Sequence, residues 1–124
     1  MIALDTSSTI AFLSGERGRD VAAVEEALRF RQGIFPPVVV TELLSDPAVR
    51  SEIGTFIRAI PRLEILDGYW ERAGELRARL LRRGLKARLA DTLIAQSCID
   101  HEVALVTRDR DFRNFTTLAG LTLE

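Results

Sequence analysis

Four acidic residues stand where carboxylates from distant parts of the chain could meet and do chemistry. Asp5, Glu42 and Asp109 each follow a short apolar run, and Asp91 opens a predicted helix. In an open α/β sheet the ligand crevice lies beyond the carboxyl ends of the strands, so residues that directly follow strands can converge there. The peptide dipole at the start of a helix favours an anion such as Asp91. Each residue alone also fits a turn or capping role, but their joint placement predicts a shared site.

Clustered carboxylates repel one another, and without a partner some would have to take up protons. A divalent cation removes that cost, and all-oxygen ligation favours Mg²⁺ or Mn²⁺ over zinc. Such an ion could activate water near neutral pH and neutralise charge on a phosphate during hydrolysis. The hydroxyls of Thr6, Ser7 and Thr107 stand beside the proposed ligands and could orient them, with helix capping as their alternative role.

Charge is distributed unevenly along a chain whose net charge is only −1. Residues 1–71 hold 7 basic and 11 acidic side chains, whereas residues 72–113 hold 10 basic and 6 acidic ones. All but one of the 17 basic residues are arginine, which suits bidentate contact with phosphate. A solvated helix face is the alternative explanation. The arginines that could bind phosphate around the acidic site are Arg79, Arg82, Arg83, Arg88, Arg108 and Arg110.

The single cysteine and the single histidine exclude several classes of protein. Neither a disulfide within the chain nor a Cys/His zinc cluster can form, and a nuclease mechanism with two histidines is excluded. Cys98 lies in an apolar helical pattern and is expected to be buried, whereas His101 fits a partner of a helix C-terminus. The chain has no targeting signal and no apolar run of about 20 residues, so we expect a soluble cytoplasmic protein without a membrane span.

Apolar runs alternate with helical patterns, which predicts one α/β domain over residues 1–124 with a parallel sheet between helices, a three-layer α/β/α arrangement. The predicted strands are Met1–Leu4, the part of the run Ile34–Val40 that follows its two prolines, Leu63–Leu66, Val103–Val106 and a short Leu121–Leu123. The predicted helices cover Ile10–Leu13, Val21–Leu28, Asp46–Ile57, Tyr69–Leu80 and Ala90 to about His101. Tyr69 and Trp70 are expected in the core or in a dimer face rather than as platforms for base stacking.

Four motifs resemble the PIN domain family and, within it, the VapC toxins of VapBC toxin–antitoxin systems: IALDTSSTIAFL, VVVTELL, LKARLADTLIAQ and ALVTRDRDF. They occur in order over the whole chain. Carried over residue by residue, the acidic ligands of that family fall on Asp5, Glu42, Asp91 and Asp109. The resemblance implies a PIN-like fold with a central four- or five-stranded parallel sheet and Mg²⁺- or Mn²⁺-dependent endoribonuclease activity. It also implies a homodimer and a small VapB-like antitoxin whose tail covers the active site.

Several alternatives remain open at this point. The compact motif TRDRDF leaves two candidates for the fourth ligand: Asp109 is nearer the strand end, whereas Asp111 could replace it, support the ligands or cap the turn at Phe112. A housekeeping nuclease of RNA processing or repair would share the same carboxylates, and a neighbouring antitoxin gene would distinguish the toxin. A catalytically silent RNA-binding module would bind RNA without metal-dependent turnover. A phosphohydrolase of small molecules is disfavoured because the chain lacks a glycine-rich phosphate loop.

Overall fold

Three short parallel strands form the centre of the structure. In the computed structural model, which describes all residues from 1 to 124, β1 (Ile2–Leu4) lies between β2 (Gly33–Ile34) and β3 (Ala104–Val106). Both neighbours run parallel to β1. The chain therefore leaves β1 on one side to form β2 and later crosses to the other side to form β3. This reversal of direction occurs beside β1, the place where open α/β sheets hold their ligands.

Two single bridges extend the sheet on both sides. Phe35, directly after β2, forms a parallel bridge with Arg62, and Leu105 of β3 forms one with Leu123. Main-chain hydrogen bonds accompany both bridges, from the Leu63 amide to the Phe35 carbonyl and from the Leu105 amide to the Thr122 carbonyl. The α/β fold with a parallel sheet is thus confirmed. Five chain segments take part in it, although only three of them form strands.

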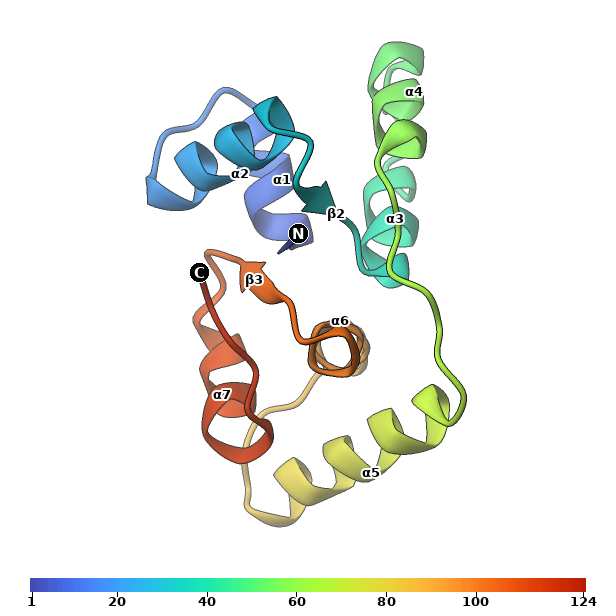
Figure 1. Ribbon diagram of the computed structural model, residues 1–124, viewed down its shortest axis with the longest axis vertical. Coiled ribbons are helices and arrows are strands. Elements are labelled where there is room, and N and C mark those ends of the chain that lie inside the picture. Colours follow the sequence, from blue (N-terminus) through green and yellow to red (C-terminus); the bar gives the residue numbers. More distant parts are fainter.

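Helices enclose the sheet in layers (Figure 1). The strands lie between the pair α1 and α2 and the group α5, α6 and α7, while α3 and α4 form a hairpin beyond β2. The helices are α1 (Thr6–Leu13), α2 (Arg19–Arg29), α3 (Pro37–Leu44), α4 (Ser51–Ala59), α5 (Tyr69–Arg82), α6 (Leu89–His101) and α7 (Arg113–Ala119), with a 3₁₀ turn, η1 (Arg110–Phe112), before α7. No helix combines the length and the apolar character that a membrane span requires.

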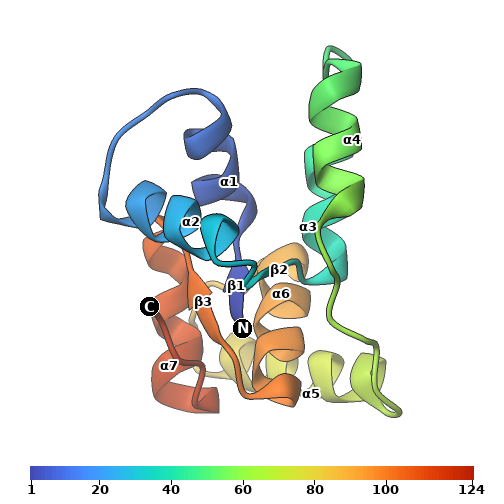
Figure 2. The ribbon, with the colours of Figure 1, turned by 45° about the horizontal axis from the view of Figure 1, so that its top comes forward.

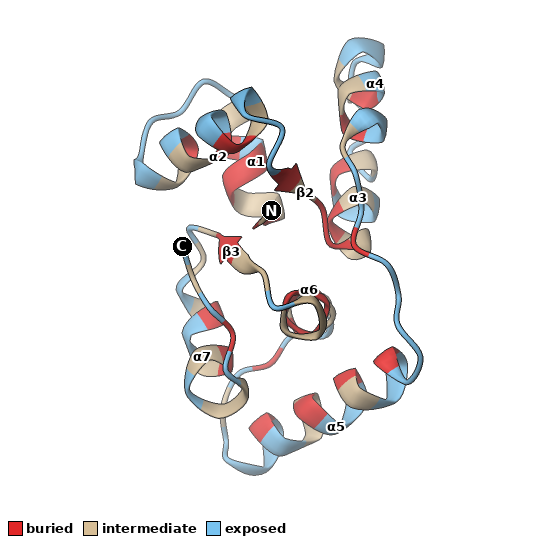
Figure 3. Cartoon of the chain, viewed as in Figure 1, coloured by how far each residue is buried: buried red, intermediate tan, exposed pale blue.

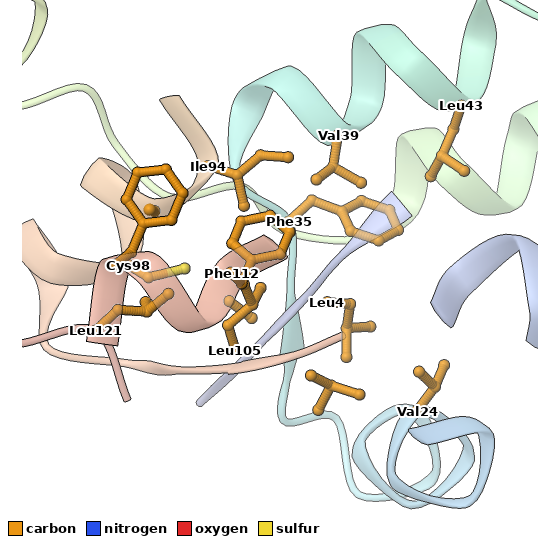
Figure 4. Packing of buried hydrophobic residues seen from close by; sticks show 14 of the residues in the cluster. Leu4, Val24, Phe35, Val39, Leu43, Ile94, Cys98, Leu105, Phe112 and Leu121 are labelled. Atoms are coloured by element: carbon orange, nitrogen blue, oxygen red, sulfur yellow. The ribbon is translucent and has the colours of Figure 1, made fainter. Parts of the chain in front are cut away.

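One cluster of 19 buried hydrophobic residues joins the layers. Leu4 and Leu105 from the strands meet Ile94 and Cys98 of α6 and Phe112 of η1 in this core (Figure 4). The helices turn their buried stripes inward, as the inner face of α5 shows (Figure 3). Tight packing of this kind fixes the strand ends relative to α6. Side chains on those elements are therefore held in a defined arrangement.

The segment Val38–Val40 is helical, so the prediction of a strand after the prolines is wrong. The β-branched valines favour strands, but Pro37 occupies the first turn of α3, where its fixed φ and missing N–H are tolerated. Val39 and Leu43 are both buried, four residues apart, as on one face of a helix. Glu42 accordingly lies on a helix rather than at a strand end.

The predicted strand Leu63–Leu66 is also absent. Only Arg62 bridges to the sheet, and Ile65 and Leu66 are exposed. The pattern of apolar residues there reflects a connector between α4 and α5 rather than a buried strand. The prediction for Tyr69 is confirmed, because its ring is buried, whereas Trp70 is 61% exposed.

Candidate metal centre

Three elements bring acidic residues to the same edge of the sheet. Asp5 directly follows β1, and its amide donates to the Val106 carbonyl at the end of β3. Asp109 follows β3 by a short turn. Because α6 leads into the parallel strand β3, its first turn lies at this carboxyl edge, and Asp91 is in that turn. Figure 2 shows the gold start of α6 at the end of the sheet where β1 leads into α1.

Asp5 is held by hydroxyl groups rather than by basic side chains. Its side chain is buried, and the hydroxyls of Ser7 and Thr107 each donate to its Oδ2 over 2.7 Å. No protein group donates a hydrogen bond to Oδ1. Although Asp5 precedes α1, its side chain does not cap that helix. The arrangement fixes the carboxylate and leaves one oxygen available as a ligand.

Thr107 joins Asp5 to Asp109. Its hydroxyl donates to Asp5 and accepts a hydrogen bond of 3.0 Å from the amide of Asp109. The Asp109 carboxylate in turn accepts from the amide of Asp111 over 2.9 Å. The turn after β3 is therefore shaped by side chains that also position the acidic groups. Of the two roles left open for these hydroxyls, Ser7 and Thr107 here hold the Asp5 carboxylate in place.

Carboxylate oxygens of Asp91, Asp109 and Asp111 lie within 4.8 Å of one another. Burial raises the pKa of Asp91, and the negative charges of Asp109 and Asp5 raise it further, although Arg88 opposes them. Asp5 therefore belongs to the same electrostatic group. An all-oxygen donor set in which negative charges crowd one another fits a hard divalent cation. These residues match the chemistry that Mg²⁺ or Mn²⁺ requires.

Two basic side chains lie against this cluster. The guanidinium of Arg88 donates to Asp91 over 3.2 Å, to Asp109 over 3.0 Å and to Asp111 over 3.1 Å. Lys86 forms an ion pair of 3.0 Å with Asp111, and its hydrogen bond lowers the pKa of that carboxyl. Among the aspartates of the cluster, Asp111 is thus the one held by both cations.

Glu42 reaches the site from a different direction. It lies on α3, and its Oε1 accepts a hydrogen bond of 2.6 Å from the hydroxyl of Thr6, the residue next to Asp5. Glu42 is not one of the three carboxylates within 4.8 Å of one another. The structure therefore brings Asp5, Asp91 and Asp109 together with Asp111, whereas Glu42 contacts Thr6 and is not part of the carboxylate group.

The six arginines predicted to bind phosphate fall into two groups. Arg108 is occupied by the protein, since it donates to both carboxylate oxygens of Asp20 and to Glu16. Arg79 donates to the Leu118 carbonyl over 2.9 Å, which ties α5 to α7. Arg88 contacts the acidic cluster. The side chains without a hydrogen bond to the protein are exposed: Arg82, Arg83 and Arg110. Sequence spacing gave no signal for the Arg108–Asp20 pair, because 88 positions separate the two residues.

The sequence matches the PIN domain family over residues 2–118. The match covers nearly all of the chain, so the chain belongs to the PIN domain family. The resemblance that the four motifs suggested is thereby confirmed. A comparison with curated protein sequences finds no match.

Solved toxin–antitoxin complexes share this fold. VapBC2 of Rickettsia felis, crystallised with a DNA fragment from its promoter, superposes with a TM-score of 0.72 at 24% identity and covers 100% of this chain and 98% of its own. A toxin–antitoxin complex from Klebsiella pneumoniae gives a TM-score of 0.68 at 19% identity, and the match covers 98% of this chain and 96% of the other chain. VapBC-5 of Mycobacterium tuberculosis gives a TM-score of 0.67 at 20% identity, and the match covers 98% of this chain and 95% of the other chain. At these sequence identities the similarity establishes the fold alone, and the shared fold extends over nearly the full length of each chain.

Proposed function

We propose that this chain is a Mg²⁺- or Mn²⁺-dependent endoribonuclease and the toxin of a toxin–antitoxin pair. The observation that carries the proposal is the convergence of carboxylates from β1, α6 and the turn after β3 at one edge of the sheet. Membership of the PIN domain family and the fold shared with VapBC complexes support it. A carboxylate site of this kind serves the hydrolysis of phosphodiester bonds.

In this proposal Asp5, Asp91 and Asp109 are metal ligands, and Glu42 completes the site from α3. A bound Mg²⁺ or Mn²⁺ would lower the pKa of water and neutralise charge on the phosphodiester during hydrolysis. The protein's own part is to hold the ligands in place: Thr107 and Ser7 fix Asp5, and the main chain of the turn after β3 fixes Asp109. The donor set then needs little rearrangement on binding.

Exposed arginines of this chain are suited to hold the RNA backbone. Arg82, Arg83 and Arg110 are free to contact phosphates, which positions a strand without reading its sequence. A VapB-like antitoxin is the proposed partner, because the solved complexes with this fold contain toxin–antitoxin pairs. A homodimer is proposed from the family resemblance. A toxin of this kind would act on RNA in the cytoplasm.

The test is cleavage of a defined RNA by protein that has been stripped of metal. We expect no cleavage in chelator, recovery on addition of Mg²⁺ or Mn²⁺, and loss of about 100-fold or more in rate for Asp91→Asn. Asp67→Asn is the matched control, because Asp67 is exposed and its carboxylate contacts no other residue. Its rate should equal that of the wild type. Full activity in chelator, or full activity of Asp91→Asn, would contradict the proposal.

A further inference from the structure

Arg88 occupies the centre of the acidic cluster in the structure. It is the N-cap residue of α6, and its side chain is not used to cap the helix. The guanidinium instead contacts one carboxylate oxygen each of Asp91, Asp109 and Asp111. These are the same three residues whose oxygens lie close enough to share one cation. A single planar group thus contacts all three of these aspartates.

Arg88 and a divalent cation would compete for some of the same carboxylate oxygens. A carboxylate oxygen that accepts a guanidinium hydrogen bond at about 3 Å has less free lone-pair density for a metal, and two cations at one site repel each other. Arg88 supplies one positive charge to a cluster of three negative charges, so it compensates the cluster incompletely. Lys86 compensates Asp111 alone.

The Arg88 side chain is also free to move away from the cluster. Its side chain is 56% exposed, whereas the side chains of Asp91, Asp109 and Asp111 are 15%, 27% and 32% exposed. No main-chain carbonyl accepts a hydrogen bond from the guanidinium, whose hydrogen bonds all go to carboxylates. The other arginine with several carboxylate partners, Arg108, differs in this respect, because it also donates to the Arg17 carbonyl. An exposed arginine can rotate away from the cluster at little cost.

We propose that Arg88 is the built-in counter-cation of the metal-free site, and that it competes with the divalent cation for the ligands Asp91 and Asp109. The arginine holds the carboxylates together when metal is absent and is released from them when metal binds. This inference rests on the proposed metal site. It assigns to this chain's own side chain a control over metal affinity, and it places a freed guanidinium beside the site for a substrate phosphate.

The experiment is a titration of metal-stripped protein with Mn²⁺ alone, read from the electron paramagnetic resonance signal of free Mn²⁺, with no RNA present. We expect Arg88→Ala to bind Mn²⁺ about fivefold more tightly than the wild type, the scale of a few exposed ion pairs. Arg110→Ala is the matched control. It removes the same charge from the residue between Asp109 and Asp111, and Arg110 forms no ion pair with a carboxylate. Its effect should stay below about twofold.

A second measurement follows the arginine itself. The Nε–H resonance of Arg88, assigned through Arg88→Lys, should shift on addition of diamagnetic Mg²⁺, whereas that of Arg108 should not. Unchanged or weaker Mn²⁺ binding by a folded Arg88→Ala variant would overturn the inference and leave the nuclease proposal standing. Failure of the wild type to bind Mn²⁺ at all would instead overturn the proposed function. The two failures are therefore distinguishable.

Discussion

Two arginines in this molecule are surrounded by carboxylates, and the pKa values of their most buried partners, Asp20 and Asp91, shift in opposite directions. Arg108 bonds Asp20 and Glu16, and its hydrogen bond lowers the pKa of Asp20 to about 2. Around Arg88, burial and neighbouring negative charge raise the pKa of Asp91 in spite of the arginine. The same residue types thus form a satisfied ion pair in one place and a cluster with surplus negative charge in the other. The surplus lies at the site for which we propose a divalent cation.

The largest expected effect separates the two aspartates of the turn after β3. Asp109 is tied to Asp5 through Thr107, whereas Asp111 is held by Lys86 and Arg88. We therefore expect Asp109→Asn to reduce RNA cleavage by about 100-fold or more, and Asp111→Asn by about tenfold or less. Initial rates at saturating Mn²⁺ measure both variants. The reverse order would assign the fourth ligand to Asp111.

The Arg108 cluster should matter for stability instead. Asp20 is ionised with a lowered pKa in the folded protein, so its contribution is fully present above its ordinary pKa of 3.8 and is lost as the pH falls through about 2. At pH 7 we expect Asp20→Asn to lower the free energy of unfolding by about 1–2 kcal/mol. By pH 3 that difference should fall to about half.

Chemical denaturation at several pH values measures this difference. Mn²⁺ affinity provides the internal control, because Asp20 contacts Arg108 and Ser8 rather than the acidic cluster. A difference between Asp20→Asn and the wild type that stays constant from pH 7 to pH 3 would show that the charge of Asp20 is not its source of stability.

The smallest expected effect is an increase, rather than a decrease, in the free energy of unfolding. Because the pKa of Asp91 is raised, its ionised form is disfavoured in the folded, metal-free protein at neutral pH. Asp91→Asn should therefore raise the free energy of unfolding slightly, by up to about 1 kcal/mol, when chelator is present. The same substitution should abolish the increase in melting temperature that Mn²⁺ gives the wild type. Scanning calorimetry with and without Mn²⁺ compares the two, and destabilisation in chelator would contradict the surplus of negative charge.

The sequence predicted the strands that carry the site more reliably than it predicted the peripheral elements. Met1–Leu4 and Val103–Val106 are buried runs without competing signals, and both form the strands that end at Asp5 and Thr107. Val38–Val40 was misread because strand propensity outweighed Pro37, whose place at the start of α3 is the stronger local constraint. Strand propensity gives the wrong prediction where valines are buried on one face of a helix.

Contacts between distant side chains could not be predicted in the same way. The expectation that Asp5 and Asp109 meet came from the rule that strand ends converge, which needs only topology. The pairs Arg108–Asp20 and Arg88–Asp111 depend on the path of loops and on rotamers, and no periodicity in the sequence encodes them. For this reason Arg108 was expected to face RNA, whereas it joins the turn after β3 to the start of α2.

Cys98 gives this molecule a useful chemical simplicity. It is the only cysteine, it is fully buried on α6, and burial together with the charge of Asp5 raises its pKa to about 12. A thiol that stays protonated and shielded reacts with neither maleimides nor peroxide at neutral pH. Thiol-specific labels should therefore not react with the native chain. A fluorophore or spin label on one introduced surface cysteine would report on RNA or antitoxin binding without removal of the natural residue.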